Sequence, residues 1–120
     1  MKQVEIYKDA LKIMEQAELS AKQDRWRCYS KVKSTGIDYY EFFSFWGLCF
    51  LIHDMCIHLT GDKTKQVMNE FKSDSEKVLN KKLDDRNFWF TDVEVDPLKA
   101  KQERIEHLKE LIKLYEDEEK

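Results

Sequence analysis

The chain has 120 residues, with 21 Lys and Arg against 24 Asp and Glu, so its formal net charge is -3. A hydrophobic content of 42% excludes a disordered chain, while 3 Gly and 1 Pro are too few for a fibrous protein or a turn-rich β-sandwich. The length suits one domain that buries its own core. We therefore expect an all-α protein, a single helical domain over residues 1–120, built as a compact bundle of four to five helices.

The first predicted helix runs from about Lys2 to Lys33. Apolar residues recur along its first half at steps of three and four, as one face of a helix requires. These are Val4, Tyr7, Leu11 and Met14. The second half is basic and aromatic, and Gly36 is expected to end the helix in the left-handed conformation.

The second predicted helix covers about residues 39–60. Asp38 is its expected N-cap, Glu41 completes a capping box three residues later, and Gly61 is expected to end it. The stretch from 42 to 52 is apolar nearly all round, and such a helix is normally surrounded by other elements. We therefore place this helix at the centre of the bundle.

The third predicted segment spans about residues 63–83. Its apolar stripe consists of Val67, Met68, Phe71, Val78, Leu79 and Leu83. Ser73 and Glu76 form a second capping-box pattern inside the segment, so the pattern leaves open whether it is one helix or two.

Residues from about 84 to 96 are rich in aromatic and β-branched side chains, and we expect an extended aromatic connector that lies over the bundle. The last predicted helix has Asp96 as N-cap and Pro97 in its first position. Its apolar seam is wide, so either it is packed on two sides within one chain or it forms a homodimer. The candidate dimer residues are Ile105, Leu108, Leu111, Ile112 and Tyr115.

The expected location is cytoplasmic. Three cysteines without framework spacing indicate free thiols in a reducing compartment, and the first thirty residues contain no uninterrupted apolar run of a secretory signal. The longest apolar stretch, residues 42–52, is shorter than the roughly 17–25 residues that a membrane-spanning helix needs. We expect no membrane contact.

Cys49, His53 and Cys56 share one face of the second predicted helix and are residue types that bind zinc. Seven residues of helix separate the two cysteines by roughly 10 Å, too far for one metal ion. His53 and Asp54 also match a two-residue string of HD-type metal-dependent phosphohydrolases, but no His precedes position 53 to complete that metal shell. A metal-dependent hydrolase around His53 and Asp54 is therefore only the third interpretation, and we expect no metal and no cofactor.

Glycines only at positions 36, 47 and 61 exclude a phosphate-binding loop, and we expect no enzyme. Opposite charges instead gather in separate aromatic segments, which favours a non-catalytic protein-interaction module: a small adaptor, regulator or inhibitor. The basic candidates are Lys22, Arg25, Trp26, Arg27, Tyr29, Lys31 and Lys33. The acidic segment offers Trp89, Asp92, Glu94 and Asp96.

The alternative function is direct binding of nucleic acid through residues 22–33, where cations could hold phosphates and aromatic rings could stack on bases. The acidic pI near 5.7 argues against it. The composition is also similar to that of accessory proteins of bacteriophages and mobile elements. That resemblance would imply a host nucleic-acid-processing complex as the target.

Overall fold

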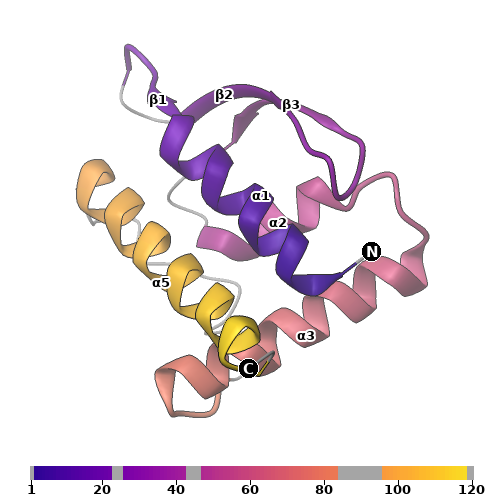
Figure 1. Cartoon of the computed structure of the whole chain (residues 1–120). Coiled ribbons are helices and arrows are strands. Elements are labelled where there is room, and N and C mark those ends of the chain that lie inside the picture. Colours follow the sequence, from indigo (N-terminus) through magenta and orange to yellow (C-terminus); the bar gives the residue numbers. More distant parts are fainter. Residues whose placement is uncertain (1, 23–25, 43–46, 84–95, 119–120) are drawn as a thin grey trace.

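The computed structural model describes residues 2–22, 26–42, 47–83 and 96–118 (Figure 1). The described part is mostly helical and adds a small antiparallel sheet with strand order β1-β2-β3. Its elements are α1 (Gln3–Gln16), β1 (Glu18–Leu19), β2 (Trp26–Lys31), β3 (Asp38–Phe42), α2 (Gly47–Met55), α3 (Gly61–Leu79) and α5 (Pro97–Glu118). The mostly helical expectation is confirmed, but the sheet replaces part of the expected all-α bundle.

Helix α1 forms where the three- and four-residue spacing of apolar side chains predicted it. Its buried face consists of Val4, Ile6, Tyr7, Ala10, Ile13 and Met14, and it packs against α5. The helix stops at Gln16 because Ala17 already has an extended backbone, with ψ 138°. The prediction of a helix continuing to Lys33 was therefore wrong.

Strand β2 occupies the basic aromatic segment that was expected to be helical. Trp26 and Cys28 are buried while Arg27 and Tyr29 are exposed, the two-residue alternation of a strand with one face on the core. The strand pairs antiparallel with β1 and β3. Gly36 has φ 77°, as expected for a glycine at a stop, but it lies in the turn between β2 and β3.

Helix α2 is much shorter than the predicted helix over 39–60. Residues 38–42 form β3, where Asp38 pairs with Lys31 in the strand register, so Asp38 does not cap a helix. Beyond Met55 the chain turns, and the Ile57 N–H donates to the Asp54 carbonyl at 3.2 Å. The expected burial holds for the helix itself, whose Leu51, Ile52 and Met55 are in the core.

Helix α3 is a single helix from Gly61 to Leu79, which settles the choice between one helix and two. The Thr60 side chain caps it by accepting a hydrogen bond from the Lys63 N–H at 3.3 Å. Gly61 therefore begins this helix and does not end the preceding one. At the other end Asn80 adopts the left-handed conformation, with φ 53°, and its N–H bonds to the Glu76 carbonyl.

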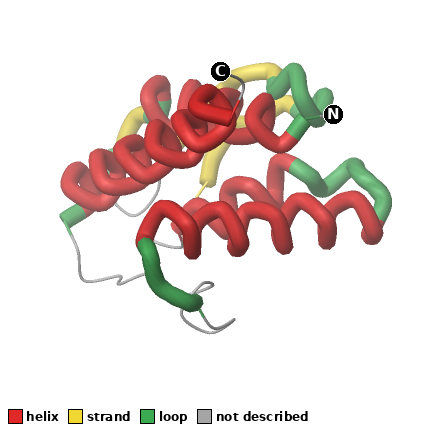
Figure 2. The backbone as a smooth tube through the Cα atoms, turned by 60° about the horizontal axis from the view of Figure 1, so that its bottom comes forward, coloured by secondary structure: helices red, strands yellow, loops and turns green. Residues whose placement is uncertain are grey.

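Helix α5 begins as predicted. Asp96 Oδ1 accepts hydrogen bonds from the N–H groups of Leu98 at 3.0 Å and Lys99 at 3.1 Å, and Pro97 is the first helical residue. The helix packs against α1 and α3, and Figure 2 shows α3 running beneath it in a second layer. The predicted connector lies outside the described residues except for Asp96.

No helix in the described ranges is long and apolar enough to cross a membrane.

Candidate functional site

The outer face of strand β2 carries what the structure retains of the basic candidate surface. Arg27, Tyr29 and Lys31 are exposed there, and 75% of Tyr29 is accessible. Lys22 and Lys33 are also exposed but lie in the segments flanking the strand. Arg25 falls outside the described residues. The strand thus separates residues that a helix would have placed on one face.

Trp26 is not part of that surface, because it is only 2% exposed. The Lys101 ammonium lies 4.8 Å from the centre of its ring, and the same ammonium donates to the Ala17 carbonyl at 3.0 Å. No hydrogen-bond partner of the Trp26 indole Nε1 is found among the described residues. Trp26 therefore joins the sheet to α5 and cannot reach a partner.

The cations of the outer sheet face each have a carboxylate opposite them. Glu18 on β1 pairs with Arg27, and Asp38 on β3 pairs with Lys31, and all four residues are exposed. Directly opposed residues of antiparallel strands project from the same face, with Cβ atoms about 4.5–5.5 Å apart. In the register of the sheet Arg27 also lies opposite Glu41 of β3, and the register shifts between Arg27 and Ser30. Acidic residues on the neighbouring strands therefore outnumber the two cations of β2, which weakens this segment as a phosphate-binding site.

A depression of about 280 Å³ opens beside Tyr29. It is lined by Gln16, Glu18, Arg27, Cys28 and Tyr29. Burial raises the pKa of the Cys28 thiol, and the nearby Lys12 ammonium opposes this only in part. The raised pKa keeps the thiol in its protonated form, which is the weaker nucleophile.

The acidic candidates contribute one described residue. Trp89, Asp92 and Glu94 lie outside the described residues. Asp96 is exposed, but its carboxylate already accepts two backbone hydrogen bonds at the start of α5. Asp96 therefore caps the N-terminus of α5.

The residues Cys49, His53 and Cys56 do not converge on one point. Both cysteines are buried, and desolvation raises the pKa of Cys49 to about 12 and that of Cys56 to about 11. His53 is exposed, with Nδ1 4.0 Å from Asp54 Oδ1, and burial raises the pKa of Asp54. The described residues contain no group of three His, Cys, Asp or Glu side chains that could hold a metal ion.

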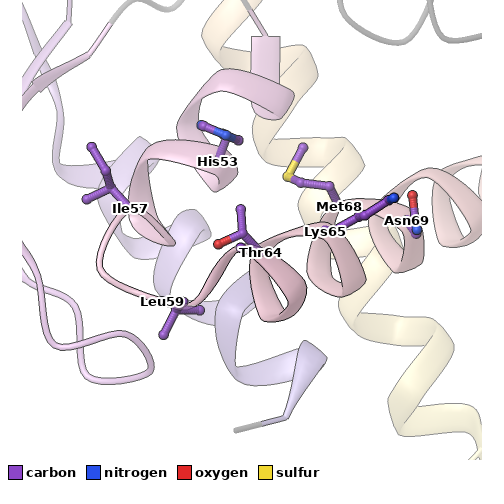
Figure 3. Close-up of a pocket in the computed structure, with 8 residues that line it drawn as sticks. His53, Ile57, Leu59, Thr64, Lys65, Met68 and Asn69 are labelled. Atoms are coloured by element: carbon purple, nitrogen blue, oxygen red, sulfur yellow. The ribbon is translucent and has the colours of Figure 1, made fainter.

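A groove that the sequence did not reveal lies between the end of α2 and the first turns of α3 (Figure 3). Its volume is about 500 Å³. The lining residues are His53, Ile57, Leu59, Gly61, Thr64, Lys65, Met68 and Asn69. Ile57 is 63% exposed at this groove, so its aliphatic side chain is available for contact. The sequence did not predict the groove because residues 56–60 were expected to be helical, whereas the chain turns there.

A buried carboxylate joins α1, α3 and α5. Asp74 Oδ2 accepts hydrogen bonds from the hydroxyls of Tyr7 at 2.7 Å and Tyr115 at 2.6 Å. Burial raises the pKa of Tyr7 far above its usual value, and the bond to Asp74 adds to the shift. Asp74 continues the three-residue spacing of the apolar stripe after Phe71, so its burial was legible in the sequence but was not predicted.

Ser75 on α3 and His107 on α5 form a second buried polar contact, with Ser75 Oγ 3.0 Å from His107 Nε2. A hydroxyl beside an imidazole is the arrangement of an activated nucleophile. Here Ser75 is only 2% exposed, so a substrate has no access to its hydroxyl. Burial lowers the pKa of His107, and the nearby Arg104 lowers it further. The pair is a contact between two helices.

The predicted dimer seam of α5 lies within the chain's own core. Ile105, Leu108, Leu111 and Ile112 are buried, and Tyr115 is partly buried with its hydroxyl bonded to Asp74. Of the two arrangements that the wide seam left open, the structure thus shows packing within one chain for these residues.

No protein-family model matches the chain, and searches of curated proteins and of solved structures found no similar protein.

Proposed function

We propose that the protein is a non-catalytic interaction module, a small adaptor, regulator or inhibitor, that binds another protein through the outer face of β2. The observation that carries the proposal is the 75% exposure of Tyr29 in the middle of this face. Tyrosine is enriched at protein interfaces because it combines a large apolar ring with a polar tip and loses little conformational freedom when it is ordered.

The surroundings of Tyr29 support a protein partner. The pairs Glu18–Arg27 and Lys31–Asp38 give the face both signs of charge, so it can form complementary contacts with a mixed protein surface. The depression beside Tyr29 is a concave surface into which a partner side chain can fit. A face of this kind confers specificity through its shape and through the positions of its charges.

Nucleic-acid binding through the same segment has less support. Arg27 and Lys31 would have to neutralise phosphates while a carboxylate lies opposite each of them. Trp26, one of the two aromatic residues expected to stack on bases, is buried. The remaining Tyr29 is suited to either partner.

The experiment is a pull-down from lysate on immobilised chain, with and without nuclease, comparing the parent with Tyr29→Ser. Leu98→Ser is the matched control, because Leu98 is a 66% exposed apolar residue at the start of α5. We expect a protein partner that survives nuclease, is lost with Tyr29→Ser and is kept with Leu98→Ser. Binding should weaken only modestly as salt rises, because exposed charge contacts are screened but each contributes little to affinity.

Recovery of nucleic acid in place of a protein partner would contradict the proposal. Recovery of nucleic acid alone, with affinity that falls steeply as salt rises and disappears in the double variant Arg27→Glu and Lys31→Glu, would replace the proposal by the nucleic-acid alternative. If the Tyr29→Ser variant still bound the protein partner, the outer face of β2 would not be the binding surface.

A further inference from the structure

The groove between α2 and α3 combines an apolar lining with a single full charge. Ile57, Leu59 and Met68 supply its large apolar side chains. Lys65 is the only Lys, Arg, Asp or Glu among the eight lining residues, and its side chain is exposed. Asp54, the carboxylate next along α2, lies against His53 and does not line the groove. The groove therefore favours an apolar occupant that carries a negative charge.

The backbone around the groove offers no edge for strand addition. The N–H groups of Cys56, Ile57 and Leu59 already donate to carbonyls three residues earlier in the turn. The Thr64 N–H donates to the Thr60 carbonyl, and the Thr64 hydroxyl donates to the Cys56 carbonyl at 3.2 Å. An extended peptide needs free backbone partners on the surface that receives it, whereas a helix satisfies its own backbone.

The length of the groove also suits a helix. On α3 the lining residues are Gly61, Thr64, Lys65, Met68 and Asn69, the last four of which are labelled in Figure 3. The first and last are separated by roughly 12 Å at 1.5 Å per residue. That length corresponds to just over two turns of a helix lying alongside. At Gly61 a side chain would meet nothing within 4 Å, so the α3 end of the groove is open space.

We propose that this groove binds a short amphipathic helix of a partner protein, with apolar side chains against Ile57, Leu59 and Met68 and an Asp or Glu paired with Lys65. Helices recognised in grooves present apolar anchors at positions i, i+3 or i+4, and i+7. Ile57 is the exposed anchor of this surface, while Met68 is mostly buried and forms the floor of the groove. The proposal uses none of the residues of the sheet face.

The test is selection of helical binders from a displayed library of random linear peptides of about 16 residues, roughly four turns of helix. The baits are the full chain, Ile57→Ser, Lys65→Glu and the control Leu98→Ser. Ile57 and Lys65 are exposed, so neither change removes a core contact, and circular dichroism confirms that each bait is folded. Selected peptides are then synthesised and their affinities measured by fluorescence anisotropy.

We expect enriched peptides with apolar residues at helical spacing next to Asp or Glu. Ile57→Ser should weaken them by at least about tenfold, as loss of a central apolar anchor does at other interfaces. Lys65→Glu should weaken them as well, and should itself select peptides with Lys or Arg at the acidic position. Leu98→Ser and Tyr29→Ser should leave their affinity unchanged, which separates this site from the proposed sheet-face function.

Three results would overturn the proposal. The first is a selection that enriches no helical peptide, or enriches peptides whose affinity Ile57→Ser leaves intact. The second is a dimer in sedimentation experiments that Ile57→Ser dissociates, because the groove would then hold a second copy of the chain. The third is a bound fatty acid in native mass spectrometry that Ile57→Ser removes, because the occupant would then be a lipid.

Discussion

Aromatic residues are buried differently in two regions of the core: the sheet side, around Trp26 of β2, and the helical side, around Tyr7 of α1 and Tyr115 of α5. On the sheet side Trp26 packs under the Lys101 ammonium, and no described residue accepts a hydrogen bond from its indole N–H. On the helical side the hydroxyls of Tyr7 and Tyr115 share the buried carboxylate of Asp74. Trp26 therefore stabilises mainly through its apolar area, while the tyrosines depend on a specific polar partner.

The difference matters because a buried polar group without a partner costs about 1–3 kcal/mol. The hydroxyls of Tyr7 and Tyr115 avoid this cost only while Asp74 is present, whereas Trp26 has no polar partner among the described residues that a substitution could remove. The sheet side should therefore respond to changes in side-chain volume, and the helical side to changes in hydrogen bonding.

The largest effect is expected at Trp26. Trp26→Ala should lower the free energy of unfolding by about 3–5 kcal/mol, because it removes a large buried ring. Trp26→Phe should cost much less, since it keeps most of the apolar area and also removes the indole N–H. Denaturant unfolding measures both. Equal losses from the two substitutions would show that the N–H has a partner and would remove the contrast between the two sides.

Asp74→Ala tests the helical side and should cost about 2–4 kcal/mol, because it leaves two tyrosine hydroxyls without their acceptor. The matched control is Asp74→Ala made together with Tyr7→Phe and Tyr115→Phe, which removes the whole network. If the network acts as a unit, the triple variant should be more stable than Asp74→Ala alone. A triple variant less stable than the single one would contradict this account.

Acid should weaken the helical side through His107. Burial lowers its pKa below the usual value of about 6.5, and Arg104 lowers it further, while Glu110 opposes the shift. The unfolded state therefore binds the proton first. Stability is fully present above the unfolded pKa and falls as pH drops below it towards the folded pKa.

The measurement is the melting temperature between pH 8 and pH 5, values that bracket roughly the usual pKa of His. The melting temperature of the parent should decline towards pH 5, and His107→Gln should decline less. The control is His58→Gln, because His58 is exposed at the end of the turn after α2. A parent profile that His107→Gln leaves unchanged would assign the acid sensitivity to other groups.

The sequence predicted the helical side better than the sheet side. Helices α1, α3 and α5 each bury one stripe at three- and four-residue spacing, and the Asp96 cap marks the start of α5. In residues 26–31 both periods are present: Trp26 and Tyr29 fit a helix, while Trp26 and Cys28 fit a strand. An alternation over so few residues does not determine whether they form a helix or a strand. Pairing with β1 and β3 determined that they form a strand.

The same reason limited the prediction of the candidate sites. Which residues of β2 are exposed depends on the strand period: of the candidates on this strand, Arg27, Tyr29 and Lys31 are exposed and Trp26 is buried. The α2–α3 groove depends on where α2 ends and the chain turns. The expected helix through 39–60 concealed that turn, and with it the exposure of Ile57.

The smallest effect compares one exposed carboxylate from each side, Asp96 on the helical side and Asp38 on the sheet side. Asp96→Ala should cost about 1 kcal/mol, because the Leu98 and Lys99 N–H groups lose their cap. Asp38 has a cap-like sequence but lies in β3 opposite Lys31, and an exposed pair of this kind contributes roughly 0.2–1 kcal/mol. Asp38→Ala should therefore cost less stability than Asp96→Ala. The difference should widen in high salt, because salt screens the pair with Lys31 more than it weakens a backbone cap.

Denaturation midpoints of the two variants at low and high salt check this order. A larger loss from Asp38→Ala would mean that residues 38–42 begin a helix, and the strand that positions the outer face around Tyr29 would have to be abandoned.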